Sequence, residues 1–218
     1  MWAWGAQENR RKSMTHTLHR RGDEKSLRED YVMLIMPARG FNLEGSSEKM
    51  KKIFEIISHY KTVNFGNARV GNSHRTTMEK LMSTDNQRIA HAVFPDRENM
   101  LGCLKELKEK DLGISVVISG LFDQVVQCCK SIGLKPHTVN HSLETIGAVQ
   151  KLPKPPVMEI ITMCGHAMIS PALVESLLEE VRSKKRTLEE ASVELSRLCD
   201  CGVFNPPRAA KIMKKMMG

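Results

Sequence analysis

The sequence is poor in aromatic residues, which make up 5% of its 218 positions, and it lacks any long apolar run. So few aromatic side chains provide little surface on which nucleic-acid bases could stack. No segment approaches the length of about 18 apolar residues that a membrane span requires. The first thirteen residues, MWAWGAQENRRKS, also lack the apolar core and cleavage site of a secretory signal. These absences predict a soluble, cytoplasmic protein without a membrane partner, and they argue against a nucleic acid as its partner.

The motifs of the commonest enzyme classes are absent as well. The sequence contains no P-loop, no dinucleotide-binding fingerprint, no H-E-x-x-H helix and no recognisable Ser-His-Asp arrangement. The substrate and the reaction therefore stay open.

Basic residues exceed acidic ones, giving a formal net charge of +8. The excess lies largely in the N-terminal segment and in the last predicted helix, which favours a solvated surface over a nucleic-acid footprint. A nucleic-acid-binding regulator is accordingly the third hypothesis for function. The six cysteines, in a reducing compartment, are expected to be metal ligands, reactive thiols or core residues and not disulfides.

Two apolar runs predict equivalent strands. Tyr31–Met36 and Ile89–Phe94 are each followed directly by proline, and each precedes a segment with helical apolar spacing. Ser46 or Ser47 is the predicted cap of the first helix, and Asp96 is the predicted cap of the second.

Further strands are predicted after these helices, at Thr62–Phe65 and at Ile114–Ile118. The order β-α-β-β-α-β predicts an α+β fold, a ferredoxin-like sandwich followed by a C-terminal helical module. A doubly wound sheet is the alternative. A third helix is expected at Leu121–Ile132.

The predicted organisation has four parts. Residues 1–30 form a partly disordered extension, 31–142 the ferredoxin-like domain, 143–156 a linker and 157–218 a strand with helices. The first domain would bind a small molecule or a protein partner, or form a homodimer.

Two polar loops of the first domain contain candidate substrate or anion contacts. The loop 37–47 contains Arg39, and the loop 66–77 contains His74 and Arg75. Ordinary turn chemistry is the alternative for the first loop, and simple mobility for the second.

The C-terminal module contains two cysteine turns, CGH at Cys164–His166 and CDCG at Cys199–Gly202. A strand at Val157–Ile161 is expected to end just before Cys164. Two helices follow, the first capped by Ser170 and the second by a Thr187–Glu190 capping box, and a last helix is capped by Asn205. An antiparallel pair of helices would return Cys199 to the level of Cys164.

Cys164, His166, Cys199 and Cys201 are therefore the predicted metal ligands, with His141 as an additional candidate. Thiolates and imidazole suit zinc or an iron–sulfur cluster, and the sequence does not choose between them. Helix N-termini nearby are expected to lower the pKa of these thiols. Metal-free reactive thiols, or reduced thiols without a function, are the alternatives.

The segments THTLHRRG, MCGHAMIS and CDCGVFNPPRA carry a resemblance. They are similar to segments of a small family of uncharacterised Cys/His-motif proteins from anaerobic microbes, over nearly the whole chain from Thr15 onward. The resemblance implies no activity, and it draws attention to the same cysteines and histidine.

The leading hypothesis is a metal- or iron–sulfur-binding protein, with redox or metal-dependent enzyme activity at the Cys/His site. The alternative is a non-catalytic accessory protein that delivers a metal or senses redox state.

Overall fold

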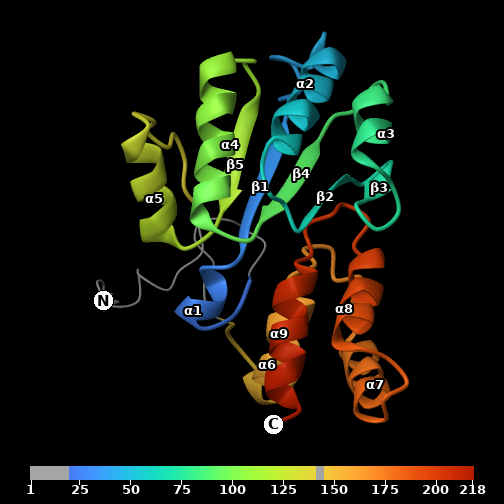
Figure 1. The fold of residues 1–218 in the computed structure, drawn as a ribbon. Coiled ribbons are helices and arrows are strands. Elements are labelled where there is room, and N and C mark those ends of the chain that lie inside the picture. Colours follow the sequence, from blue (N-terminus) through green and yellow to red (C-terminus); the bar gives the residue numbers. More distant parts are fainter. Residues whose placement is uncertain (1–19, 141–144) are drawn as a thin grey trace, which may run out of the picture.

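The computed structural model describes residues 20–140 and 145–218 and confirms a mixed α+β architecture. Its sheet has five strands in the order β3-β2-β4-β1-β5, and every neighbouring pair is antiparallel. Figure 1 shows α2 and α4 packed on the sheet, and α6 to α9 gathered as a separate group at its lower end.

The elements follow one another in a simple order along the chain. The strands are β1 (Tyr31–Met36), β2 (Asn64–Asn67), β3 (Gly71–Asn72), β4 (Ala90–Phe94) and β5 (Ser115–Ser119). The helices of the first part are α1 (Glu24–Leu27), α2 (Ser46–Ser58), α3 (Met78–Ser83), α4 (Arg97–Lys110) and α5 (Phe122–Ser131). The helices of the second part are α6 (Pro155–Ile161), α7 (Pro171–Arg182), α8 (Leu188–Arg197) and α9 (Pro206–Met216).

The predicted strands of the first part are confirmed, with boundaries that shift by one or two residues. Asp96 caps α4 as predicted, because its side chain accepts a hydrogen bond from the backbone N–H of Asn99 at 2.8 Å. The predicted serine cap of α2 is wrong: Gly45 occupies the cap position and Ser46 is the first helical residue. Gly45 has φ 68°, a left-handed conformation that glycine adopts without strain.

The strand β1 divides the core because its side chains alternate between two faces. Tyr31, Met33 and Ile35 belong to a cluster with buried residues of α2 and α4. Val32 and Leu34 belong to a second cluster, which is made mostly of residues from α6 to α9. The central strand thus contributes to both cores: side chains on one of its faces pack with α2 and α4, and Val32 and Leu34 on the other face belong to the C-terminal cluster.

The predicted strand at Val157–Ile161 is wrong, since these residues lie in helix α6. A segment of five residues, four of them apolar, does not distinguish a buried strand from a buried helix by its periodicity. Pro155 and Pro156 occupy the first helical positions, where a missing N–H costs nothing, and Val157 and Ile160 are buried on one side. Cys164 therefore follows a helix and does not lie at the end of a strand.

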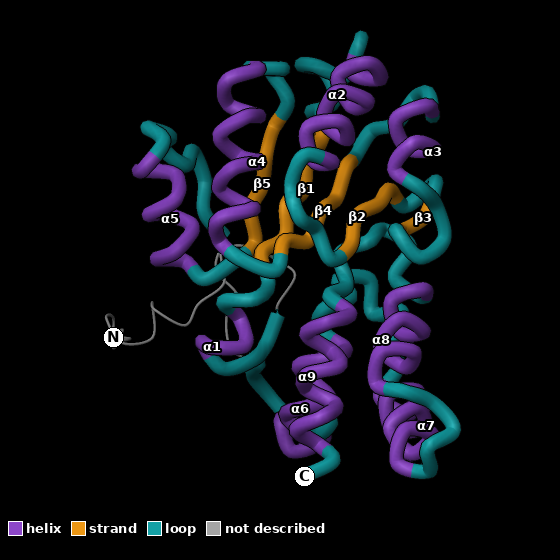
Figure 2. Tube along the Cα trace, viewed as in Figure 1, coloured by secondary structure: helices purple, strands orange, loops and turns teal. Residues whose placement is uncertain are grey.

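The helical pair α7 and α8 is confirmed. Ser170 caps α7, and Thr187 and Glu190 form the predicted capping box of α8. Figure 2 shows the two helices side by side, joined by a short loop at the end distant from the sheet. None of the described helices combines the length with the apolar character that a membrane span requires.

Candidate functional site

The first cysteine turn follows α6 and contains two candidate ligands, one buried and one exposed. The backbone N–H of Cys164 donates to the carbonyl of Ile161 at 3.2 Å, and that of Ala167 donates to the carbonyl of Cys164 at 3.2 Å. Ala167 has φ 53°, a left-handed conformation that closes the turn. Cys164 is 4% exposed, whereas His166 lies at the surface.

The second cysteine turn packs directly against the sheet. The backbone N–H of Gly202 donates to the carbonyl of Cys199 at 2.9 Å. Gly202 has φ 81°, and a Cβ atom there would lie 2.5 Å from the carbonyl oxygen of Phe65 in β2. Only glycine satisfies both the conformation and the close approach.

Two buried asparagines of the sheet fix the backbone around this turn. The side-chain amide of Asn72 donates to the carbonyls of Ser196 and Cys199, at 2.8 and 2.9 Å. The amide of Asn64 donates to the carbonyl of Phe204 at 2.8 Å and to the hydroxyl of Ser196 at 3.0 Å. We call this pair the asparagine clamp. Sequence analysis missed it, because nothing near an isolated asparagine indicates a partner more than a hundred residues away.

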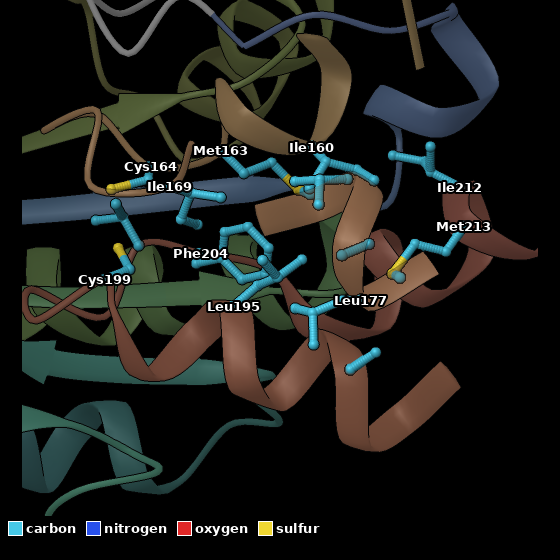
Figure 3. Close-up of a cluster of buried hydrophobic side chains, with 14 of the residues drawn as sticks. Ile160, Met163, Cys164, Ile169, Leu177, Leu195, Cys199, Phe204, Ile212 and Met213 are labelled. Atoms are coloured by element: carbon cyan, nitrogen blue, oxygen red, sulfur yellow. The ribbon is translucent and has the colours of Figure 1, made fainter. Parts of the chain in front are cut away.

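The structure brings the two turns together. Cys164 and Cys199 share a side-chain hydrogen bond, and Figure 3 shows them at the same end of the C-terminal hydrophobic cluster. The Sγ atoms of Cys199 and Cys201 lie 3.7 Å apart, and Sγ of Cys201 lies 3.6 Å from Nδ1 of His166. The four predicted ligands therefore contact one another in the order Cys164, Cys199, Cys201, His166.

The thiols differ in acidity according to their position in this order. The hydrogen bond that Cys164 shares with Cys199, together with burial, raises the pKa of the Cys164 thiol. At Cys199 the hydrogen bond with Cys164 lowers the pKa, but the hydrogen bond with Cys201 and burial outweigh it and raise the pKa to about 11. The hydrogen bond from Cys199 lowers the pKa of Cys201 despite burial. The pKa of Cys201 is thus lowered by its thiol neighbour and not by a helix N-terminus, and the pKa values of Cys164 and Cys199 are raised, opposite to the expectation.

Backbone N–H groups also point at the sulfurs. The N–H of Val203 interacts with both Cys199 and Cys201, and those of His166 and Met168 interact with Cys164. Each of these contacts favours the thiolate, because an N–H donor stabilises negative charge on sulfur. Such donors are a common second shell of metal thiolates.

The other candidates from the sequence divide into three groups. Arg75 lies beside the site: its Nη1 pairs with the carboxylate of Asp200, between the two cysteines of the turn, at 2.6 Å. His74 is held nearby, since its backbone N–H donates to the side-chain oxygen of Asn72 at 2.9 Å. Arg39 is exposed in the loop after β1, a loop that Asn42 ties to Gly113 ahead of β5. His141 lies outside the described residues.

Burial and the charge of Arg197 lower the pKa of His74. Its imidazole is therefore neutral at neutral pH. Within the described residues, Nε2 of this ring is buried without a hydrogen-bond partner.

A buried ionic cluster adjoins the second turn, and sequence analysis did not predict it. Asp30 is fully buried. Its carboxylate pairs with Nη1 of Arg20 at 2.6 Å and with Nη1 of Arg208 at 2.8 Å. The Nη2 of Arg20 donates to the carbonyl of Val203, the residue whose N–H faces the sulfurs. We call these three residues the arginine–aspartate cluster. The sequence pattern predicts that the N-terminal basic residues are exposed to solvent. It therefore does not indicate that Arg20 is buried.

The described residues also line a partly open cavity of about 470 Å³ at the β5 edge of the sheet. Its walls come from α4, β5, α5 and the chain around Leu134 to Asn140, and most of them are apolar. None of the four candidate ligands lines it. The cavity and the Cys/His turns are separate features.

In the part of the chain that the structure describes, no three or more His, Cys, Asp or Glu side chains are arranged as a formed metal site. The thiols contact one another in sequence instead of surrounding a common centre. Comparison of this chain with known families, curated proteins and solved structures finds no match.

Proposed function

We propose that Cys164, His166, Cys199 and Cys201 bind one thiophilic metal ion. The single observation that carries this proposal is the spacing of the side chains. At a Zn–S distance of about 2.3 Å, tetrahedral angles separate two sulfurs by about 3.8 Å, and a sulfur and an imidazole nitrogen by about 3.6 Å. Sγ of Cys201 lies 3.7 Å from Sγ of Cys199 and 3.6 Å from Nδ1 of His166.

A mononuclear ion fits this spacing better than an iron–sulfur cluster. In a four-iron cluster each cysteine binds a different iron, so the sulfurs are separated by the width of the cluster. Here Cys201 contacts both Cys199 and His166 at the separations expected between two ligands of one metal ion. Zinc is the leading candidate, and a single iron ion would suit the same ligands. Binding requires the side chains to turn from one another toward a common centre.

The scaffold of the first part is proposed to be ferredoxin-like. When the short β3 is set aside, the remaining strands lie in the order β2-β4-β1-β5, which supports two interleaved β-α-β units. In this proposal the sheet serves as a platform, and the asparagine clamp holds the second cysteine turn on it.

An accessory role, in metal delivery or redox sensing, is favoured over catalysis at the metal. The cavity of about 470 Å³ lies at the β5 edge of the sheet, and none of the four proposed ligands lines it. His166 is exposed while the three thiols are buried. One ligand could therefore exchange at the surface of a cytoplasmic protein while the thiolates retain the ion.

Elemental analysis of anaerobically purified protein tests the proposal. We expect one zinc or iron per chain in wild type, and loss of that metal in Cys201→Ala. Cys103→Ala is the matched control, because Cys103 is buried in the other hydrophobic cluster and should leave the metal content unchanged. Folded wild-type protein without stoichiometric metal would refute the proposal. A brown colour with several irons per chain would replace it with a cluster.

A further inference from the structure

The second cysteine turn holds two thiols next to each other in one short piece of backbone. The N–H of Gly202 donates to the carbonyl of Cys199 at 2.9 Å, which closes a four-residue turn with the two cysteines at its first and third positions. Cys199 and Cys201 are free thiols, and their Sγ atoms lie 3.7 Å apart. A disulfide joins two sulfurs at about 2.05 Å, so this pair requires only a short approach of its side chains.

The backbone of this turn is fixed by the sheet. The amide of Asn72 donates to the carbonyl of Cys199 at 2.9 Å, and Gly202 lies so close to the carbonyl of Phe65 that no Cβ fits between them. Two reacting groups that a rigid scaffold holds together react far faster than the same groups free in solution. The sheet therefore holds the two thiols as neighbours that can react with each other.

The third thiol is a less suitable partner for Cys199. Cys164 also shares a hydrogen bond with Cys199, but it belongs to the turn after α6, where its N–H donates to the carbonyl of Ile161 at 3.2 Å. A bond between Cys164 and Cys199 would have to draw together two turns that α6 and α8 hold separately. A bond between Cys199 and Cys201 forms within a single turn.

We infer that Cys199 and Cys201 are a redox-active dithiol, which a peroxide oxidises to a disulfide within the turn. The sulfur of one cysteine attacks an oxygen of hydrogen peroxide, so that an S–O bond forms, the O–O bond breaks and water leaves. The sulfur of the other cysteine then attacks this sulfenic acid, forming the S–S bond and releasing the second oxygen as water. The two sulfurs lose two electrons to the peroxide, and the two thiol protons end in the water.

The disulfide would also regulate the proposed metal site, and this part of the inference rests on the proposed function. Cys199 and Cys201 are two of the four proposed ligands, and a metal ion binds them as thiolates, which a disulfide no longer provides. Oxidation therefore releases the ion, and a bound ion protects the two thiols from oxidation.

Mass spectrometry of reduced, metal-free wild-type protein after treatment with hydrogen peroxide tests the inference. The remaining thiols are alkylated and the chain is cut with trypsin, which releases Leu198–Arg208 with Cys199 and Cys201 as its two cysteines. We expect this peptide to escape alkylation and to be two hydrogen atoms lighter than its dithiol form.

A second tryptic peptide is the control within the same sample. Asp111–Lys130 also contains two cysteines, Cys128 and Cys129, but these are consecutive residues of helix α5, so their side chains do not face each other. This peptide should be alkylated at both positions. Cys164→Ser should still give the lighter Leu198–Arg208 peptide, because the third thiol takes no part in the bond.

Zinc separates the inference from the proposed function. At ten times its dissociation constant it leaves about one tenth of the sites empty, so it should slow the oxidation about tenfold. A Leu198–Arg208 peptide that stays alkylated in folded protein, or that is joined to the peptide of Cys164, would overturn the inference alone. Oxidation that zinc does not slow, in protein that binds no zinc, would overturn the proposed function and leave the redox-active dithiol.

Discussion

At the scale of single residues, the three thiols interact in the order Cys164, Cys199, Cys201. Either thiol can donate in the contact between Cys199 and Cys201. The interaction with the next sulfur raises the pKa of Cys164 and that of Cys199, and the interaction with Cys199 lowers the pKa of Cys201.

This order of contacts predicts a pH dependence for the metal-free protein. The pKa of Cys199 is about 11 in the folded state, above the value of about 8.5 in an unfolded chain. A raised pKa means that the fold binds the proton more tightly, so its contribution to stability is complete below pH 8.5 and is lost as pH rises towards 11. Urea denaturation should show the free energy of unfolding decreasing across this window.

The control for the pH prediction is Cys199→Ser, whose hydroxyl does not titrate in this range. The free energy of unfolding of this variant should decrease less steeply with pH, since the substitution also removes the partner that raises the pKa of Cys164. Parallel declines in the two proteins would contradict the predicted order of thiols.

Gly202 permits the second cysteine turn to reach the sheet. Gly202→Ala places a Cβ 2.5 Å from the carbonyl oxygen of Phe65, at φ 81°. We expect a loss of about 2 to 4 kcal/mol in the free energy of unfolding, from backbone strain and overpacking together. Gly40→Ala is a close control, with φ 83° and no atom within 4 Å of the added Cβ, and it should cost about 1 kcal/mol. Equal losses at the two glycines would mean that the turn does not press on β2.

At the scale of elements, the asparagine clamp links β2 and β3 to the end of α8. Asn72→Ala removes two hydrogen bonds and leaves the carbonyls of Ser196 and Cys199 buried without that donor. The free energy of unfolding should fall by about 2 to 4 kcal/mol. Arg75→Ala breaks a nearby but exposed ion pair with Asp200 and should cost less than about 1 kcal/mol. Denaturant titration of both variants measures the difference, and a mild effect of Asn72→Ala would argue against a clamp.

Much of the element order could be predicted from the sequence because the signals are local. The run at Tyr31–Met36, the Asp96 cap and the Thr187–Glu190 capping box each lie within a few consecutive residues. The segment Val157–Ile161 carries no such signal, because its apolar pattern is too short to show a period and the two prolines before it suit a loop equally well.

The candidate site could be predicted only in part. Spacing alone suggested that a helical pair would return Cys199 to Cys164, and the two thiols do meet. The partners that hold the turns could not be found this way. Asn64, Asn72 and Arg20 act on residues more than a hundred positions away, and a contact of that range leaves no local trace in one sequence.

At the scale of the whole molecule, the C-terminal helices complete the core of the sheet. Val32, Leu34 and Val93 belong to the same hydrophobic cluster as Phe204 and Leu195. A fragment of residues 20–140 would expose these side chains to water. We expect it to bind a hydrophobic dye such as ANS and to melt without a sharp transition, whereas the full chain binds little dye and melts cooperatively. A fragment that melts sharply and binds no dye would show that the sheet is stable without the helices.

The shared core also places the proposed metal site between parts of the chain that are far apart in sequence. The sheet, the helical pair and the segment before α1 all contact the second cysteine turn. Metal binding should therefore stabilise the molecule as a whole and not one helix alone.

X-ray absorption at the zinc or iron edge of anaerobically purified protein tests the central claim most directly. Our account predicts one metal ion with three sulfur neighbours at about 2.3 Å and one nitrogen neighbour at about 2.0 Å. A coordination shell made only of oxygen and nitrogen, or folded protein that contains no stoichiometric metal, would contradict it.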